Sequence, residues 1–122
     1  MTDYPPTLVL RVQPPDEKKL YQVVEFQGDM DKAGLEVVKE KLETLADTFP
    51  GQYLVFDFSD LNYVNSEGIG FLIALHTHLL KLKKGLVFLS AKPHVKDVFF
   101  VIGILSIVEY YDSMDSFLKK VA

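Results

Sequence analysis

The amino-acid sequence predicts an α/β fold, with a mixed, mostly parallel sheet of four to five strands, an N-terminal hairpin and about four helices. Short apolar runs alternate with amphipathic stretches along the chain, in the order β-β-α-β-α-β-α-β-α. Residues 53–58 are almost uninterrupted in their apolar character, as expected of a central parallel strand buried between helices. The chain has 122 residues, of which 48% are hydrophobic, so we expect residues 1–122 to form a single domain.

The first two strands are expected to pair as an antiparallel hairpin. Residues 7–12 are typical of a β-strand, and residues 20–26 form a second run of this kind. Pro14 and Pro15 lie between them, and proline interrupts strand pairing. The connection is too short for a crossover, so the sequence predicts antiparallel strands.

One amphipathic helix is expected before the central strand in the chain and a second one after it. Asp31 is placed to cap the first, which ends near residues 49–51. Its apolar positions recur at spacings of three and four residues: Leu35, Val38, Leu42 and Leu45. The second helix follows a turn at residues 59–67, and Gly85 is expected to stop it before a buried strand at residues 86–89.

The last third of the chain predicts a helix, a strand and a closing helix. Residues 95–102 form a short, very apolar helix that Gly103 can end, followed by a strand at residues 107–111. Asp112, with Asp115 in the first turn, is expected to cap a helix that runs through Val121. Residues 98–102 are expected in the core. If part of this helix is exposed, its natural use is partner binding or self-association as a weak homodimer.

Composition excludes several classes of function. The chain has no cysteine, which excludes disulfides and Cys-ligated metals, and its formal net charge of −4 disfavours nucleic-acid binding. Lys81, Lys83 and Lys84 are expected to close a helix, where cations suit the carboxyl end. His76 and His78 point to different sides of one helix, so no metal or other cofactor is expected, and His76 is expected to pack with one hydrogen bond. No apolar run is long enough to enter a membrane, and we expect a cytoplasmic protein.

Ser66 lies where the turn after the central strand becomes the next helix. Ligands of open α/β sheets gather beyond the carboxyl ends of the strands, so this segment is the first candidate for a site. A phosphate on a serine here would meet free N–H groups and the positive end of the helix dipole. The residues alone leave a second possibility open, in which Asn65 or Ser66 only caps the helix.

Residues 60–70 resemble the STAS domain of bacterial anti-sigma factor antagonists. In that family a strand ends in Asp-Leu, and a turn leads to Asp-Ser-x-Gly-hydrophobic-Gly at the start of the next helix. Asp60 and Leu61 match the first part, and the second part is matched by Ser66, Gly68, Ile69 and Gly70. Gly28-Asp29-Met30-Asp31 is similar to the family's turn after the second strand, and residues 100–116 resemble its later pattern. The matches cover nearly the whole chain.

The resemblance implies a regulatory binding protein and no catalysis. In this family the unphosphorylated antagonist binds an anti-sigma factor that is also a serine kinase, which frees the sigma factor. That kinase can then phosphorylate the serine that matches Ser66. The implied partner surface consists of Asp29, Met30, Asp31, Asn65, Ser66, Glu67 and Gly68. Two residues depart from the family. Asn65 replaces its Asp, and Glu67 would lie beside a phosphate and raise the free energy of the phosphorylated state by like-charge repulsion.

Three other functions are weighed against this one. The first is a STAS-like domain that is not phosphorylated and serves as a structural subunit of a transporter or signalling complex. The second is a response-regulator receiver with Asp57 as acceptor, but the acidic pair that would hold magnesium after the first strand is absent. The third is a small α/β enzyme, for which no base, metal or oxyanion set accompanies Ser66.

Overall fold

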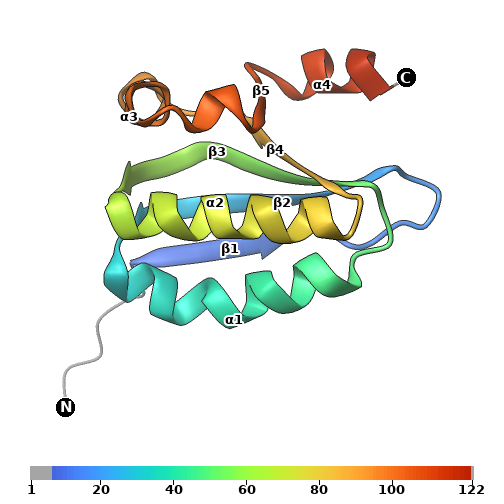
Figure 1. Ribbon diagram of the computed structural model, residues 1–122, viewed down its shortest axis with the longest axis horizontal. Coiled ribbons are helices and arrows are strands. Elements are labelled where there is room, and N and C mark those ends of the chain that lie inside the picture. The colour runs from blue at the N-terminus through green and yellow to red at the C-terminus, as the bar shows by residue number, and fades with distance from the viewer. Residues whose placement is uncertain (1–6, 122) are drawn as a thin grey trace.

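The computed structural model describes residues 7–121, which form one five-stranded sheet with helices packed against it (Figure 1). The strands lie in the order β1-β2-β3-β4-β5, so β3 is central as predicted. β1 pairs antiparallel with β2, and the other pairs are parallel, which confirms the mixed sheet and its N-terminal hairpin. The strands are β1 (Leu8–Val12), β2 (Tyr21–Met30), β3 (Tyr53–Val64), β4 (Gly85–Leu89) and β5 (Glu109–Tyr111).

Helices cover both faces of the sheet. The crossover helices α1 (Lys32–Thr48) and α2 (Ser66–Lys81) pack on one face over the larger core. That core contains tilted and edge-to-face phenylalanines, with ring centroids 4.7 Å apart for Phe26 and Phe56 and 4.9 Å apart for Phe58 and Phe88. The closing helix α4 (Met114–Val121) packs on the opposite face through the buried Phe117. The two faces together explain why the strands are apolar on both sides.

Strand β3 is longer than predicted. It continues past Phe58 to Val64, and in this stretch Phe58, Leu61 and Val64 are buried while the two residues between each pair are exposed. Two register shifts against β2 each insert one additional residue into β3, so the inward side chains recur every third residue. The predicted turn at residues 59–67 is therefore wrong. Two bulges give the buried residues of β3 a spacing of three, which does not show the alternation expected of a strand and so led to the prediction of a turn. β2 likewise runs beyond Phe26 to Met30.

The end of α2 also differs from the prediction. The helix ends at Lys81, and the residue in the left-handed conformation after it is Lys83, with φ of 61°. Gly85 does not stop the helix and instead begins β4. Lys84 reaches back across the molecule, where its Nζ donates to the Phe49 carbonyl at 2.8 Å.

The closing helix has a different cap from the predicted one. The Ser113 hydroxyl accepts the N–H of Ser116 at 3.1 Å, so Ser113 takes the capping role expected of Asp112. Asp112 instead forms an ion pair with Lys96, whose Nζ lies 3.0 Å from its Oδ1. Asp112 and Ser113 are both residue types that cap helices. Here the Asp112 carboxylate pairs with Lys96, and the Ser113 hydroxyl makes the cap.

The apolar helix α3 (Pro93–Ile102) is only half buried. Gly103 ends it with φ of 90°, as predicted, and a short 3-10 helix η1 (Ile104–Ser106) follows. Phe99 is fully buried, but Phe100 and Val101 are 75% and 81% exposed. The expectation that residues 98–102 lie in the core is thus wrong for the outer side of the helix.

Candidate functional site: the N-terminus of α2

The N-terminus of α2 is fixed by Asn65. Its Oδ1 accepts the N–H of Gly68 at 2.9 Å, and its own N–H donates to the Met30 carbonyl at 3.1 Å. The first bond closes the first helical turn, and the second joins that turn to the end of β2. Asparagine performs this cap without the negative charge of an aspartate.

Ser66 is the first residue of α2 and its side chain is exposed. Among residues 7–121 no hydrogen-bond partner is found for its hydroxyl, because the capping bond is made by Asn65. The N–H groups of Ser66 and Glu67 belong to the first turn and have no intrahelical acceptor. A group added to the hydroxyl therefore reaches solvent and lies at the positive end of the helix dipole.

Gly68 is required by packing directly beneath this turn. A Cβ on Gly68 would lie 2.9 Å from the Met30 carbonyl oxygen and 2.9 Å from side-chain atoms of Met30 and Val64. Met30 itself is fully buried. Met30 and Gly68 thus lie below the surface, where their packing fixes the position of Ser66 relative to the end of the sheet.

The two crossover helices begin side by side. Asp31 caps α1, with its Oδ1 2.8 Å from the N–H of Gly34, as Asn65 caps α2. Met30 and Val64, which end β2 and β3, are paired in the register, so both helices start from one edge of the sheet. The predicted site residues are therefore brought together. Ser66 and Glu67 are exposed, whereas Asp29, Asp31 and Asn65 are half-buried.

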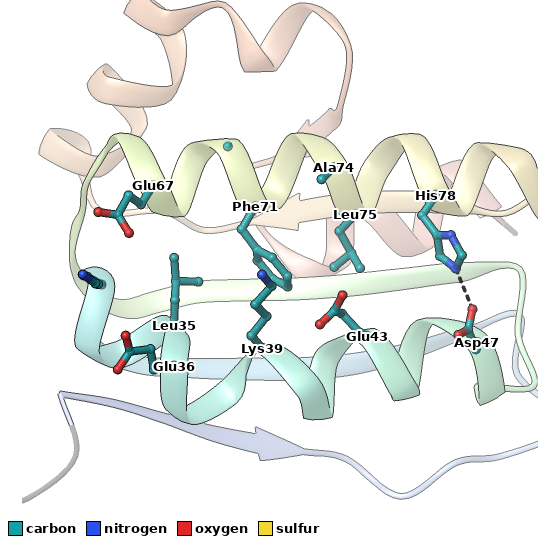
Figure 2. A pocket seen from close by; sticks show the side chains of 12 residues that line it. Leu35, Glu36, Lys39, Glu43, Asp47, Glu67, Phe71, Ala74, Leu75 and His78 are labelled. Carbon is teal, nitrogen blue, oxygen red and sulfur yellow. Dashed lines mark hydrogen bonds and ion pairs between the residues drawn. The ribbon is translucent and has the colours of Figure 1, made fainter.

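A groove between α1 and α2 extends from this site and was missed by the sequence reasoning. It has a volume of about 680 Å³ and begins beside Glu67. Figure 2 shows Phe71 and Leu75 directed from α2 toward α1, with His78 bound to Asp47 at the far end, where Nε2 and Oδ1 are 2.6 Å apart. Gly70 also lines the groove, and a Cβ there would meet no atom within 4 Å. Only the family-like Gly-hydrophobic-Gly pattern pointed to this surface.

Helix α3 starts near the same edge. The His94 Nε2 lies 2.6 Å from the Asn62 carbonyl oxygen, and the Lys92 Nζ donates to the Asn62 side chain. Asn62 lies in the bulged end of β3, four residues before Ser66. Figure 1 shows α3 beside the arrowhead of β3, at the end of the molecule where α2 begins.

The groups considered for metal or phosphoryl chemistry are dispersed. Within residues 7–121 no three His, Asp or Glu side chains are grouped closely enough to hold a metal ion. Asp57 accepts the N–H of Ser59 at 2.9 Å within β3. Burial lowers the pKa of His76, and its Nδ1 is buried with no partner among the described residues, so the single hydrogen bond expected for it is not found. No helix in this part of the chain is long and apolar enough to cross a bilayer.

The fold and the capped serine turn define a STAS domain. The family model for the STAS domain matches residues 9–117, and the chain belongs to this family. A curated relative from Bordetella bronchiseptica, named as a candidate anti-sigma factor antagonist, BtrV, is 29% identical over 91 residues, which cover 75% of this chain and 78% of the relative.

Solved structures share the fold at lower identity. An anti-sigma factor antagonist from Mycobacterium paratuberculosis matches with a TM-score of 0.79 and 22% identity, covering 98% of each chain. The unphosphorylated form of the anti-sigma factor antagonist SpoIIAA matches with a TM-score of 0.75 and 17% identity, over 93% of this chain and 96% of that one. The phosphorylated form of SpoIIAA from Bacillus matches with a TM-score of 0.68 and 16% identity, over 93% and 100%.

Proposed function

We propose that this STAS domain is a partner-switching protein of the anti-sigma factor antagonist type. In its unphosphorylated form it binds an anti-sigma factor that is also a serine kinase, and phosphorylation of Ser66 releases that partner. The observation that carries the proposal is the exposed Ser66 hydroxyl at the first position of α2, which has no hydrogen-bond partner among residues 7–121, while Asn65 makes the cap. Support comes from similarity to SpoIIAA, which has been solved in unphosphorylated and phosphorylated forms.

The geometry provides a physical basis for such a switch. A phosphate adds a charge of about −1.5 to −2 on a surface that already presents Glu67 and lies beside Asp29 and Asp31. A partner that covers this surface would have to desolvate the phosphate and face the added charge. A change of about 1.4 kcal/mol alters affinity tenfold, so one phosphate is sufficient without refolding the domain.

Glu67 determines how costly the phosphate is for the domain itself. Its carboxylate lies in the first turn, next to the acceptor, but it is exposed, so solvent and salt screen the repulsion. The N–H groups of the first turn and the positive end of the helix dipole stabilise the phosphate. We therefore propose that Ser66 accepts a phosphate despite this neighbour.

The proposal is tested with purified anti-sigma kinases from the source organism. Incubation with ATP should modify one residue, and mass spectrometry should map the phosphate to Ser66. The Ser66→Ala variant should remain unmodified and bind the kinase as tightly as the wild-type chain, whereas Ser66→Asp should bind at least tenfold more weakly. Modification at another residue, or equal binding by both variants, would remove Ser66 from the switch.

A second candidate is a STAS domain that is never phosphorylated and serves as a structural subunit of a transporter or signalling complex. The exposed Glu67 next to Ser66 favours it, because it adds like charge at the acceptor. Stable copurification with such a complex, unaffected by Ser66→Asp, would distinguish this candidate from the first.

A further inference from the structure

We infer that Lys32 is the counter-charge for a phosphate on Ser66, so that the two residues form an ion pair between α1 and α2 in the phosphorylated chain. The inference rests on the proposed phosphorylation of Ser66 and adds the residue that offsets the repulsion from Glu67. Lys32 is the first residue of α1, as Ser66 is of α2, and both side chains are exposed.

Both residues lie on the sides of their helices that face the groove. Residues four positions apart share one side of a helix. Ser66 is four residues before Gly70 and eight before Ala74, and both of these line the groove from α2. Lys32 lines the same groove from α1. The Ser66 side chain therefore continues the row that faces α1, at the end of the groove where both helices begin.

Lys32 and a phosphate on Ser66 lie at the same level along the two helices. The helices run in the same direction (Figure 1), and Asp47 and His78 join their far ends at 2.6 Å. Ser66 is twelve residues before His78, and Leu35 is twelve residues before Asp47, so Ser66 and Leu35 are level. Lys32 lies about 4.5 Å further toward the N-terminal end. Helical side chains tilt in that direction, so a phosphate on Ser66 extends toward Lys32.

The Lys32 ammonium group is available for this contact. The three ion pairs among residues 7–121 involve other cations, so no carboxylate in this part of the chain lies within 4.0 Å of the Lys32 Nζ. The adjacent Asp31 uses its Oδ1 to cap α1. Packed helices have axes about 8–10 Å apart, and the flexible four-carbon stem of lysine together with a phosphoserine spans such a distance.

The charges at this end of the groove favour Lys32 as the partner. Figure 2 shows Glu36 and Glu67 there, on opposite sides of the groove. A phosphate adds a charge of about −1.5 to −2 beside these two carboxylates. Lys39 also lines the groove, but it lies further along α1 than Glu36, away from Ser66 (Figure 2). Lys32 is thus the groove-lining cation nearest to the phosphate.

The pairing is tested with phosphoserine incorporated at position 66 during translation through an amber codon, which supplies the phosphate without a kinase. Titration followed by phosphorus-31 NMR measures the second pKa of the phosphate, which is about 6 without a partner. Lys32 favours the doubly charged form and lowers this pKa. Lys32→Gln should therefore raise it by about 0.2–0.7 units, as expected of an exposed ion pair, and Lys32→Arg should keep the original value.

Lys41→Gln is the matched control. It removes the same charge from an exposed position of α1, on the side of the helix away from the groove. Solvent and salt screen a charge at that distance, so the phosphate pKa should change by no more than about 0.1 units. Circular dichroism checks that the variants are folded.

Three results would overturn the inference. One is an unchanged phosphate pKa in Lys32→Gln, and another is an equal rise in Lys41→Gln, which would reflect net charge alone. The third is a larger rise in Lys39→Gln than in Lys32→Gln, which would place the partner further along the groove. A kinase assay that leaves Ser66 unmodified would refute the proposed function, while the NMR titration would still decide whether Lys32 pairs with the phosphate.

Discussion

Gly68 and Gly70 lie two positions apart in α2 and have opposite surroundings. A Cβ on Gly68 would lie within 2.9 Å of atoms of Met30 and Val64, and a Cβ on Gly70 would meet no atom within 4 Å. The first glycine allows α2 to start directly on the ends of β2 and β3. The second leaves the groove beside Phe71 open. The same residue type thus has a packing role at one position and a surface role at the other.

These surroundings predict opposite effects of the same substitution. Gly68→Ala should lower the free energy of unfolding by about 1–3 kcal/mol, because the methyl group has to displace backbone and side-chain atoms. Gly70→Ala should raise it by about 0.5–1 kcal/mol, since alanine is the better helix former and the position is open. Urea unfolding of both variants measures the difference. Equal effects would mean that Gly68 does not support the turn.

The residues of the turn were largely predictable from the sequence. Asn65 and Asp31 are residue types that cap helices, and both do so. The burial of Met30 was not predictable, because it depends on the pairing of Met30 with Val64 on another strand. A hydrophobic residue in a turn between two aspartates gives no sign of whether a neighbouring helix covers it.

At the scale of elements, β3 illustrates why sequence patterns fail at functional sites. Its first half is an almost uninterrupted apolar run and was recognised, but its second half buries Phe58, Leu61 and Val64 at a spacing of three. Polar residues fill the exposed positions, and this composition is typical of a loop. The spacing arises from register against β2, which is a property of the pair of strands and not of either sequence alone.

Helix α4 depends on one anchor. It has eight residues, too few for a stable isolated helix, and of these only Phe117 is fully buried. The Phe117 ring contacts three tyrosine rings at centroid distances of 5.5, 5.8 and 5.7 Å; they are Tyr21, Tyr53 and Tyr111. The smaller core, on the face of the sheet that α4 covers, is therefore arranged around the Phe117 side chain.

Phe117→Ala should consequently release α4 before the rest of the domain. The cost of emptying this site is about 3–5 kcal/mol. Hydrogen exchange should show the amides of α4 losing protection while those of β3 keep most of theirs. Leu118→Ala, at a half-buried neighbouring position, is the control and should have a smaller effect. Uniform loss of protection across the sheet would show that α4 and the sheet unfold as one unit.

At the scale of the whole molecule, the order of elements and the class of fold followed from the sequence. The exposed side of α3 did not, because a helix with apolar residues all round is usually buried, and only the packed structure shows which side remains uncovered. The groove between α1 and α2 has the same origin. It lies between two helices whose outer positions are polar or small, and the distance between them is set by their connection to neighbouring strands.

The stability of the whole domain should depend on pH through His76. Burial lowers the pKa of His76 below its ordinary value of 6.5, so the unfolded chain binds a proton at a pH where the folded chain resists it. The contribution to stability is present above pH 6.5 and is lost as the pH falls through that value toward the pKa of the folded state.

Urea unfolding at pH 7.5 and pH 5.5 measures this dependence. The wild-type chain should be less stable at pH 5.5, and His76→Leu should reduce the difference, because it removes the proton-binding group and its unpartnered nitrogen. Thr77→Val, at an exposed position of the same helix without a titratable group, should keep the wild-type difference. An unchanged difference in His76→Leu would assign the pH dependence to other groups.

The two additional residues in β3 also limit how this chain can change in length. Removing one of the exposed residues between Phe58 and Val64 would remove a bulge, shift the pairing of the following residues with β2 by one position and move the first turn of α2 relative to α1. The hairpin connection at residues 13–20 is exposed throughout and is not under this constraint. Insertions and deletions among descendants of this sequence should accordingly accumulate in the connection, while the distance from Phe58 to Ser66 stays constant.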